Sequence, residues 1–144
     1  MLYFAYGSNL LKSRMLSRCP SAEVVCVDVF KGYVLTFNKL GVDGTAKANI
    51  SKSLGDVRGV IYTIDSQDVK KLDATEGEGV HYTRTKITTT KGISCWTYVA
   101  CVDKIVCDIY PSHQYKNMII KGMEAFKFPV SYISRVYETK SVNK

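Results

Sequence analysis

The stretch Tyr6–Leu10, which reads YGSNL, combines small and polar residues directly after an apolar run at the start of the chain. This order predicts a strand that ends in a turn and leads into a helix over Leu10–Arg18. Gly7 accepts backbone angles closed to other residues, and the side chain of Ser8 or Asn9 is suited to capping the helix. Free backbone N–H groups at such a junction can bind an anion, such as a carboxylate or a phosphate. The same kind of turn also occurs with no binding role, where it only connects a strand to a helix.

Glu76 is a candidate functional carboxylate in the stretch Leu72–Gly77, which reads LDATEG. The residues around this stretch predict a short helix over Asp65–Thr75 that Gly77 and Gly79 bring to an end. Glu76 therefore lies near the C-terminal end of the helix. The helix dipole raises the pKa of a carboxyl group placed there.

Other interpretations of these acids are open at the level of sequence. Glu76 also has the surroundings of a solvated loop residue, and Asp73 and Glu78 are acids of the same kind close by. Spacing alone does not choose among the three. If Glu78 lies close to Glu76, like-charge repulsion would raise the pKa of Glu76 further.

A third stretch, Pro111–Lys116, reads PSHQYK and completes a pattern. The stretches Leu2–Leu10 (LYFAYGSNL), Leu72–Gly77 and Pro111–Lys116, in this order, resemble the γ-glutamyl cyclotransferase family, with its AIG2-like and butirosin-type members. The resemblance extends from Leu2 to about Val136. It implies an α+β fold, a small mixed β-barrel with flanking helices, in which the first turn and the Glu76 loop meet at one mouth of the barrel.

The resemblance also implies a reaction. The α-amine of a γ-glutamyl compound attacks its own γ-carbonyl and releases 5-oxoproline with a free amino acid or amine, without a metal or other cofactor. Glu76 matches the family's catalytic glutamate, as general acid and base. The residues that the resemblance places around the substrate are Tyr3, Tyr6, Gly7, Ser8, Asn9 and Tyr115. Tyr82 and Tyr98 are weaker candidates, since alternate residues of a hairpin also pack into a barrel core.

Three functions are therefore considered. The first is cyclotransferase activity on γ-glutamyl amino acids or dipeptides. The second is the same chemistry on γ-glutamyl amines or on a γ-glutamyl-protected metabolite. The third is a binding protein that keeps the pocket without turnover, which the presence of Glu76 argues against.

Composition predicts one globular domain over residues 1–138, followed by a polar, frayed tail at 139–144, for a chain with 46% hydrophobic residues. No segment approaches the ~20 apolar residues of a membrane helix, and no signal-peptide pattern is present, so we expect a cytoplasmic protein. The five cysteines, an odd number without a C-x-x-C pair, are expected to be reduced. His81 and His113 are the only histidines and lack zinc-ligand spacing to a cysteine, so no metal site is predicted.

The formal net charge of +7 has two interpretations. Basic domains can bind nucleic acid, but here the basic residues are scattered, with no run longer than Lys70-Lys71. We therefore expect no nucleic-acid partner, and infer that the positive field attracts a small anionic γ-glutamyl substrate. The sequence leaves a homodimer open.

Short apolar runs separated by glycines predict many short strands and a few helices. Strands are expected over Leu2–Ala5, Ala22–Phe30, Tyr33–Phe37, Ala46–Ile50 and Val57–Ile64, and as a hairpin of His81–Thr90 with Ile93–Cys101. Helices are expected over Leu10–Arg18, over Asp65–Thr75 with Asp65 or Ser66 as its cap, over Ser112–Phe126, and over Val130–Tyr137 after Pro129. Breaks are expected at Lys31-Gly32, at Gly41–Thr45 and at Leu54-Gly55-Asp56.

Overall fold

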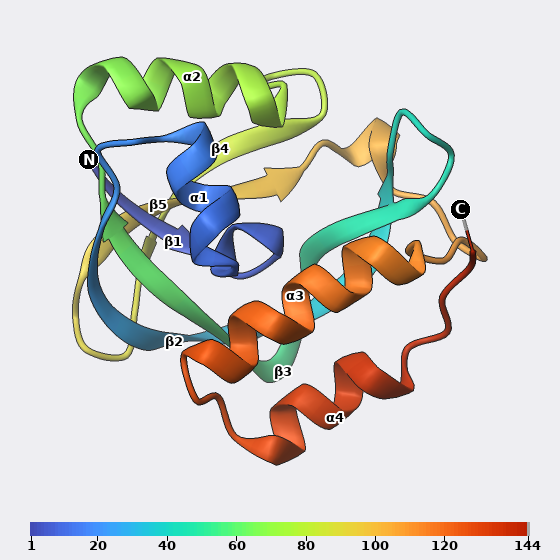
Figure 1. The fold of residues 1–144 in the computed structure, drawn as a ribbon. Helices are drawn as coiled ribbons and strands as arrows, with labels where there is room; N and C mark the ends of the chain where they lie inside the picture. Colours follow the sequence, from blue (N-terminus) through green and yellow to red (C-terminus); the bar gives the residue numbers. More distant parts are fainter. Residues whose placement is uncertain (144) are drawn as a thin grey trace.

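The computed structural model describes residues 1–143, which form one five-stranded sheet with helices packed around it (Figure 1). The sheet has the order β2-β3-β1-β5-β4, with β1 (Leu2–Ala5), β2 (Glu23–Leu40), β3 (Ala46–Thr63), β4 (Tyr82–Thr88) and β5 (Ser94–Ala100). The α-helices are α1 (Lys12–Arg18), α2 (Ser66–Glu76), α3 (His113–Ala125) and α4 (Val130–Glu138), and the 3-10 helices are η1 (Ser8–Leu10) and η2 (Val102–Lys104). Helices α3 and α4 lie together, and α2 lies at the opposite end of the sheet (Figure 1).

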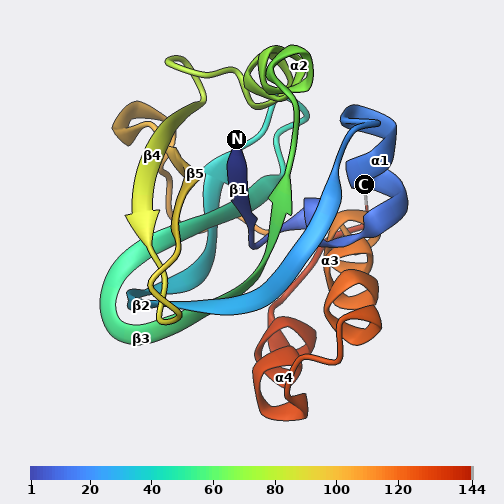
Figure 2. The same ribbon diagram turned by 90° about the vertical axis from the view of Figure 1, so that its left-hand side faces the viewer.

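The sheet curls into a barrel that is not fully closed. Strands β2 and β3 form a long antiparallel pair of 18 residues each, and Figure 2 shows this pair bending round toward the β4–β5 hairpin. Strand β1 joins the two halves, because it pairs antiparallel with β3 and parallel with β5. The predicted α+β fold, a small mixed β-barrel with flanking helices, is confirmed, with a gap left between the edge strands β2 and β4.

Two of the predicted strand breaks are wrong. Strand β2 continues through Lys31-Gly32, and β3 continues through the expected turn at Leu54-Gly55-Asp56. The register explains this, since Lys31 pairs with Asp56 whereas Tyr33 pairs with Lys52. The unpaired residues in between form a bulge, which bends a strand pair without ending it. The glycine-containing stretches that predicted strand ends instead mark the place where the β2–β3 pair bends.

The helices agree more closely with the sequence. Asp65 caps α2, its carboxylate accepting a hydrogen bond from the Asp68 amide at 2.8 Å. Ser112 caps α3 in the same way, and α4 begins directly after Pro129. Within residues 1–143, no helix combines the length and the apolar character that spanning a bilayer requires.

The turn after β1 differs from its prediction. The helix expected over Leu10–Arg18 begins at Lys12, and the residues before it form the separate 3-10 helix η1. Neither Ser8 nor Asn9 caps α1, whose N-cap residue Leu11 makes no side-chain hydrogen bond. Both polar side chains are buried instead.

Direct backbone contact holds η1 against α3. Gly122 in α3 has no side chain, and a Cβ at this position would lie 2.5 Å from the carbonyl carbon of Leu10 and 2.6 Å from the amide nitrogen of Leu11. A larger residue would push the helix away from the turn. The position of η1 is therefore fixed by close packing.

Backbone hydrogen bonds connect Val142, which follows α4, to the residues at the start of α3. The Val142 amide donates to the carbonyl of Pro111, and the His113 amide donates to the carbonyl of Val142.

The five cysteines are free thiols, and burial raises the pKa of both Cys19 and Cys95 to about 11. These two thiols therefore remain protonated at neutral pH.

The carboxylate of Asp28 bridges the gap between the edges of the barrel. This buried side chain in β2 accepts hydrogen bonds from the hydroxyls of Thr89 and Thr90, which follow β4. Burial alone would raise the pKa of Asp28, but the hydrogen bonds from these hydroxyls and from the Val29 amide outweigh burial and hold the pKa below its ordinary value. The ionised form therefore stabilises the fold.

Replacing Asp28 with Ala is expected to lower the free energy of unfolding at neutral pH by about 2 kcal/mol, because the buried Thr89 and the exposed Thr90 lose the acceptor of their hydroxyls. The folded-state pKa of Asp28 is depressed, so its contribution is present above the unfolded value of about 4 and is lost as pH falls through the folded pKa. Urea unfolding at about pH 7 and at lower pH measures the difference. The exposed Asp56→Ala serves as control, and equal losses in the two variants would contradict the bridging role.

Candidate active site

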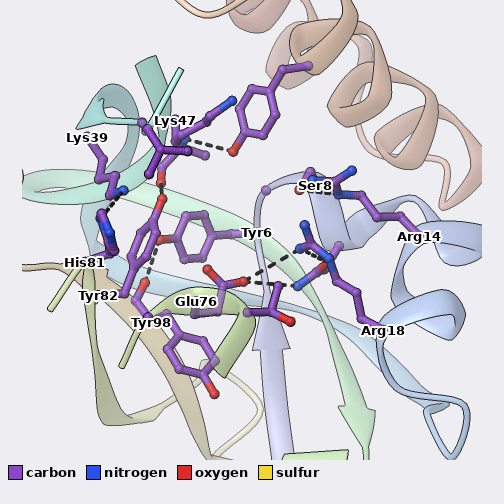
Figure 3. Close-up of a pocket in the computed structure, with 18 of the residues that line it drawn as sticks. Tyr6, Ser8, Arg14, Arg18, Lys39, Lys47, Glu76, His81, Tyr82 and Tyr98 are labelled. Atoms are coloured by element: carbon purple, nitrogen blue, oxygen red, sulfur yellow. Dashed lines mark hydrogen bonds and ion pairs between the residues drawn. The ribbon is translucent and has the colours of Figure 1, made fainter. Parts of the chain in front are cut away.

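A cavity of about 460 Å³ opens between η1, the C-terminal end of α2, the start of β3 and the start of α3. Figure 3 shows the side chains that point toward it. All seven residues expected in the site line this cavity, namely Tyr3, Tyr6, Gly7, Ser8, Asn9, Glu76 and Tyr115. Tyr82 and Tyr98 line it as well, so the hairpin tyrosines belong to the pocket wall.

Glu76 is the last residue of α2, and Gly77 ends the helix in a left-handed conformation with φ of 61°. A Cβ on Gly77 would also lie 2.8 Å from the imidazole of His81, so both the backbone angle and the space require glycine. The predicted position of Glu76 at the helix end is confirmed. Its side chain is only 16% exposed, which excludes the interpretation as a solvated loop residue.

The last turn of α2 is tied to the hairpin below it. Asp73, three residues before Glu76, accepts a hydrogen bond from the Tyr98 hydroxyl at 2.5 Å and an ion pair from Arg84 at 3.0 Å. Because Tyr98 and Arg84 both lie in the hairpin, the end of the helix cannot move independently of the sheet. Asp73 thus supports the position of Glu76 and does not line the cavity itself.

The carboxylate of Glu76 faces cations and one amide. Its Oε1 lies 3.4 Å from Asn9 Nδ2 and 3.9 Å from the guanidinium Nη1 of Arg18, which also donates to Asn9 Oδ1 at 2.8 Å. Burial raises the pKa of Glu76, and the charges of Arg18, Arg14 and Lys39 oppose this only in part. A carboxyl with a raised pKa is suited to exchange protons near neutral pH.

Glu78, which could have repelled Glu76, contributes little to this shift. Its Oε2 accepts a hydrogen bond from the Arg84 amide at 3.4 Å, on the hairpin. Burial is the largest cause of the raised pKa of Glu76.

The turn Gly7–Asn9 forms the wall beside Glu76. Within residues 1–143, the amides of Gly7, Ser8 and Asn9 donate no hydrogen bond to a protein acceptor. A Cβ on Gly7 would lie 3.1 Å from the Cβ of Ala48, so the turn packs closely on β3. Unpaired amides at the edge of a cavity can bind a carboxylate or a developing oxyanion.

The tyrosine hydroxyls of the pocket divide into two groups. Those of Tyr6 and Tyr82 donate to the backbone carbonyls of Tyr98 and Ala48, at 2.6 and 2.7 Å, and so hold the wall together. Tyr115 instead accepts a hydrogen bond from the Ala48 amide at 3.0 Å, and burial raises its pKa to about 12. Its hydroxyl therefore keeps its proton and has it free for a ligand.

The hydroxyl of Tyr3 resembles that of Tyr115, because it also accepts a hydrogen bond and keeps its own proton. Its hydroxyl accepts a hydrogen bond from Asn9 Nδ2 at 3.0 Å, and burial, followed by the charge of Glu76, raises its pKa well above the ordinary value. Tyr3 and Tyr115 thus offer the cavity two neutral hydroxyl donors.

Sequence reasoning missed the cations of the cavity wall, which are Arg14, Arg18, Lys39 and Lys47, together with His81. Arg14 and Arg18 lie four residues apart directly after the turn, a spacing that places them on one helix face. This signal was available in the sequence. Lys39 and His81 come from a strand end and a loop, where no periodicity reveals a common location. Among the cavity-lining residues within 1–143, Glu76 is the only acid.

The described part of the chain contains no group of three or more His, Cys, Asp or Glu side chains that could hold a metal ion. The groups able to do chemistry at the cavity are one carboxyl, several cations, hydroxyls and free amides. This set suits proton transfer and the binding of anionic groups.

Comparison with known proteins agrees with this geometry. The family model described as gamma-glutamyl cyclotransferase, AIG2-like, matches residues 3–117. Gamma-glutamylcyclotransferases of Mus musculus and Homo sapiens are each 34% identical to the chain over 142 residues, covering 91% of this chain and 74% of their own. A solved structure of a gamma-glutamyl cyclotransferase superposes with a TM-score of 0.85 at 29% identity, covering 100% of this chain and 90% of that protein.

The matched residues 3–117 include the turn after β1, the start of β3, the end of α2 and the start of α3, which all line the cavity. The chain therefore belongs to the gamma-glutamyl cyclotransferase, AIG2-like family of enzymes.

Proposed function

We propose that this chain is a γ-glutamyl cyclotransferase in which Glu76 is the general acid and base. The observation that carries the proposal is the position of Glu76. It is a largely buried carboxyl with a raised pKa, the only acid among the described residues that line a cationic cavity, and it lies beside a turn with free amides. The activity of the 34%-identical relatives supports the same assignment.

The reaction forms one carbon–nitrogen bond and breaks another. The Glu76 carboxylate accepts a proton from the α-ammonium group of the substrate, and the resulting amine attacks the γ-carbonyl carbon. As the intermediate collapses, Glu76 returns the proton to the leaving nitrogen, and the bond from the γ-carbon to that nitrogen breaks. The ring nitrogen loses its second proton, which ends on the released amine. The products are 5-oxoproline and an ammonium compound, and the carboxylate is regenerated.

The cavity also holds the substrate in the shape that cyclises. Free amides of Gly7, Ser8 and Asn9 are suited to bind the α-carboxylate or the oxyanion that develops on the γ-carbonyl. The hydroxyls of Tyr3 and Tyr115 provide two further donors. Fixing a flexible glutamyl chain so that its own amine lies near the γ-carbon accounts for a large share of the rate.

A second candidate, a binding protein without turnover, would need the same cations and amides. A pure binder would gain from an ionised carboxylate that pairs with the α-ammonium group. It would not gain from a carboxyl whose pKa burial raises, because protonation removes that charge. The placement of Glu76 therefore favours the enzyme.

Glu76→Gln is expected to lower kcat for 5-oxoproline release by at least about a hundredfold, because it removes the proton acceptor and keeps the shape. The assay uses a panel of γ-glutamyl compounds and follows 5-oxoproline by chromatography. Glu78→Gln is the matched control, since it makes the same change two residues away, outside the cavity lining. Activity that survives in Glu76→Gln, or is lost equally in both folded variants, would contradict the assignment.

The same variant is expected to unfold less readily than the wild type at neutral pH. The folded state favours the neutral form of Glu76, since burial raises its pKa, so the charged form costs stability above the folded pKa. The cost disappears below the unfolded value of about 4.3, where the group is protonated in both states. Chemical denaturation as a function of pH measures the difference, and a variant less stable than the wild type at about pH 7 would contradict the raised pKa.

A further inference from the structure

Lys39 is a buried cation that has no acidic partner in the described chain. Only 4% of the residue is exposed, although it lines the cavity. The ion pairs within residues 1–143 do not include it. Removing an ammonium group from water without a counter-charge is unfavourable. A ligand that brings an anion to this point would supply the missing charge.

The contacts of Lys39 leave it available to a ligand. Its Nζ lies 2.9 Å from Nδ1 of His81 and 5.3 Å from the ring centre of Tyr82. An ammonium group only donates hydrogen bonds, so Nδ1 of His81 accepts and the proton of the neutral imidazole is on Nε2. The charge of Lys39 lowers the pKa of His81, in agreement with a neutral ring. The pair therefore offers hydrogen-bond donors and a net positive charge.

Lys39 and His81 lie across the cavity from the turn at Ser8, whose free amides are suited to bind an anion (Figure 3). In Figure 3, Lys39 and His81 are on one side, Ser8 and the two arginines are on the other, and Glu76 is drawn between them. The charges of Arg18, Arg14 and Lys39 all lower the pKa of Glu76, so cations on both sides of the cavity act on this carboxyl. The neighbouring Lys47 differs from Lys39, because it already pairs with Asp43 at 3.3 Å.

The two sides of the cavity correspond to the two ends of a γ-glutamyl substrate, the glutamyl end and the leaving group. When the glutamyl end lies on the turn and the scissile bond lies at Glu76, the leaving group extends toward Lys39. We infer that Lys39, supported by His81, binds a carboxylate carried by the leaving amine. The site then selects γ-glutamyl amino acids over γ-glutamyl amines. The inference rests on the proposed function and assigns the side of the cavity that determines specificity.

The test compares two substrates that differ only in this charge, γ-glutamyl-alanine and γ-glutamyl-alaninamide. The wild type is expected to favour the carboxylate compound in kcat/KM by roughly ten- to a hundredfold, as for one charge-assisted hydrogen bond. In Lys39→Met the ratio of the two kcat/KM values should fall to about one, whereas Lys39→Arg should restore part of the preference. Lys104→Met removes a charge near Lys39 without touching the cavity lining, so it should keep the preference.

The outcomes are separable. A wild type that uses both compounds equally well, or a Lys39→Met variant that keeps the full preference, would overturn the inference and leave the cyclotransferase intact. Absence of 5-oxoproline from both compounds would overturn this inference, and absence across the whole panel of γ-glutamyl compounds would refute the proposed function as well. The wild-type ratio needs no variant, so the test remains decisive even if Lys39→Met does not fold.

Discussion

Burial of the Glu76 carboxyl is the interaction on which the arrangement of the pocket depends. The side chain is withdrawn from water at the end of α2, and its nearest polar partners are Asn9 and Arg18. Those partners come from the segment that follows β1, so the first strand and the second helix must meet for the carboxyl to be held. Burial raises its pKa while the cations keep ionisation within reach. One group can therefore accept and return a proton.

The rest of the fold supplies rigid support to this pair of segments. Gly122 lets α3 pack on the backbone of η1, and Asp73 ties the end of α2 to the hairpin. Strand β1 lies between β3 and β5, so the turn that follows it cannot shift without disturbing the sheet. The cavity is thus lined by the turn after β1, by helix ends and by residues of all five strands, so the sheet holds its wall in place. Such pre-organisation is what an intramolecular cyclisation requires.

The sequence predicted most of this arrangement, and its errors have physical causes. Gly77 predicted the end of α2 correctly, because a left-handed residue is required there. The breaks at Lys31-Gly32 and at Leu54-Gly55-Asp56 were misplaced, because a bulge and a turn use the same residue types. Local pattern also could not show that Lys39 lies in the cavity wall with His81, since strand bending brings them together.

Measuring the pKa of Glu76 tests the central role of its carboxyl most directly. A carbon-13 NMR titration of side-chain carboxyl carbons, with Glu76→Gln used to assign the signal, reports it without substrate. Because burial raises the pKa of Glu76, we expect a midpoint above the ordinary value for glutamate, which is about 4.3. A further expectation is that Arg18→Gln moves this midpoint upward, since Arg18 opposes the effect of burial. A midpoint at or below the ordinary value would contradict the central role of the buried carboxyl.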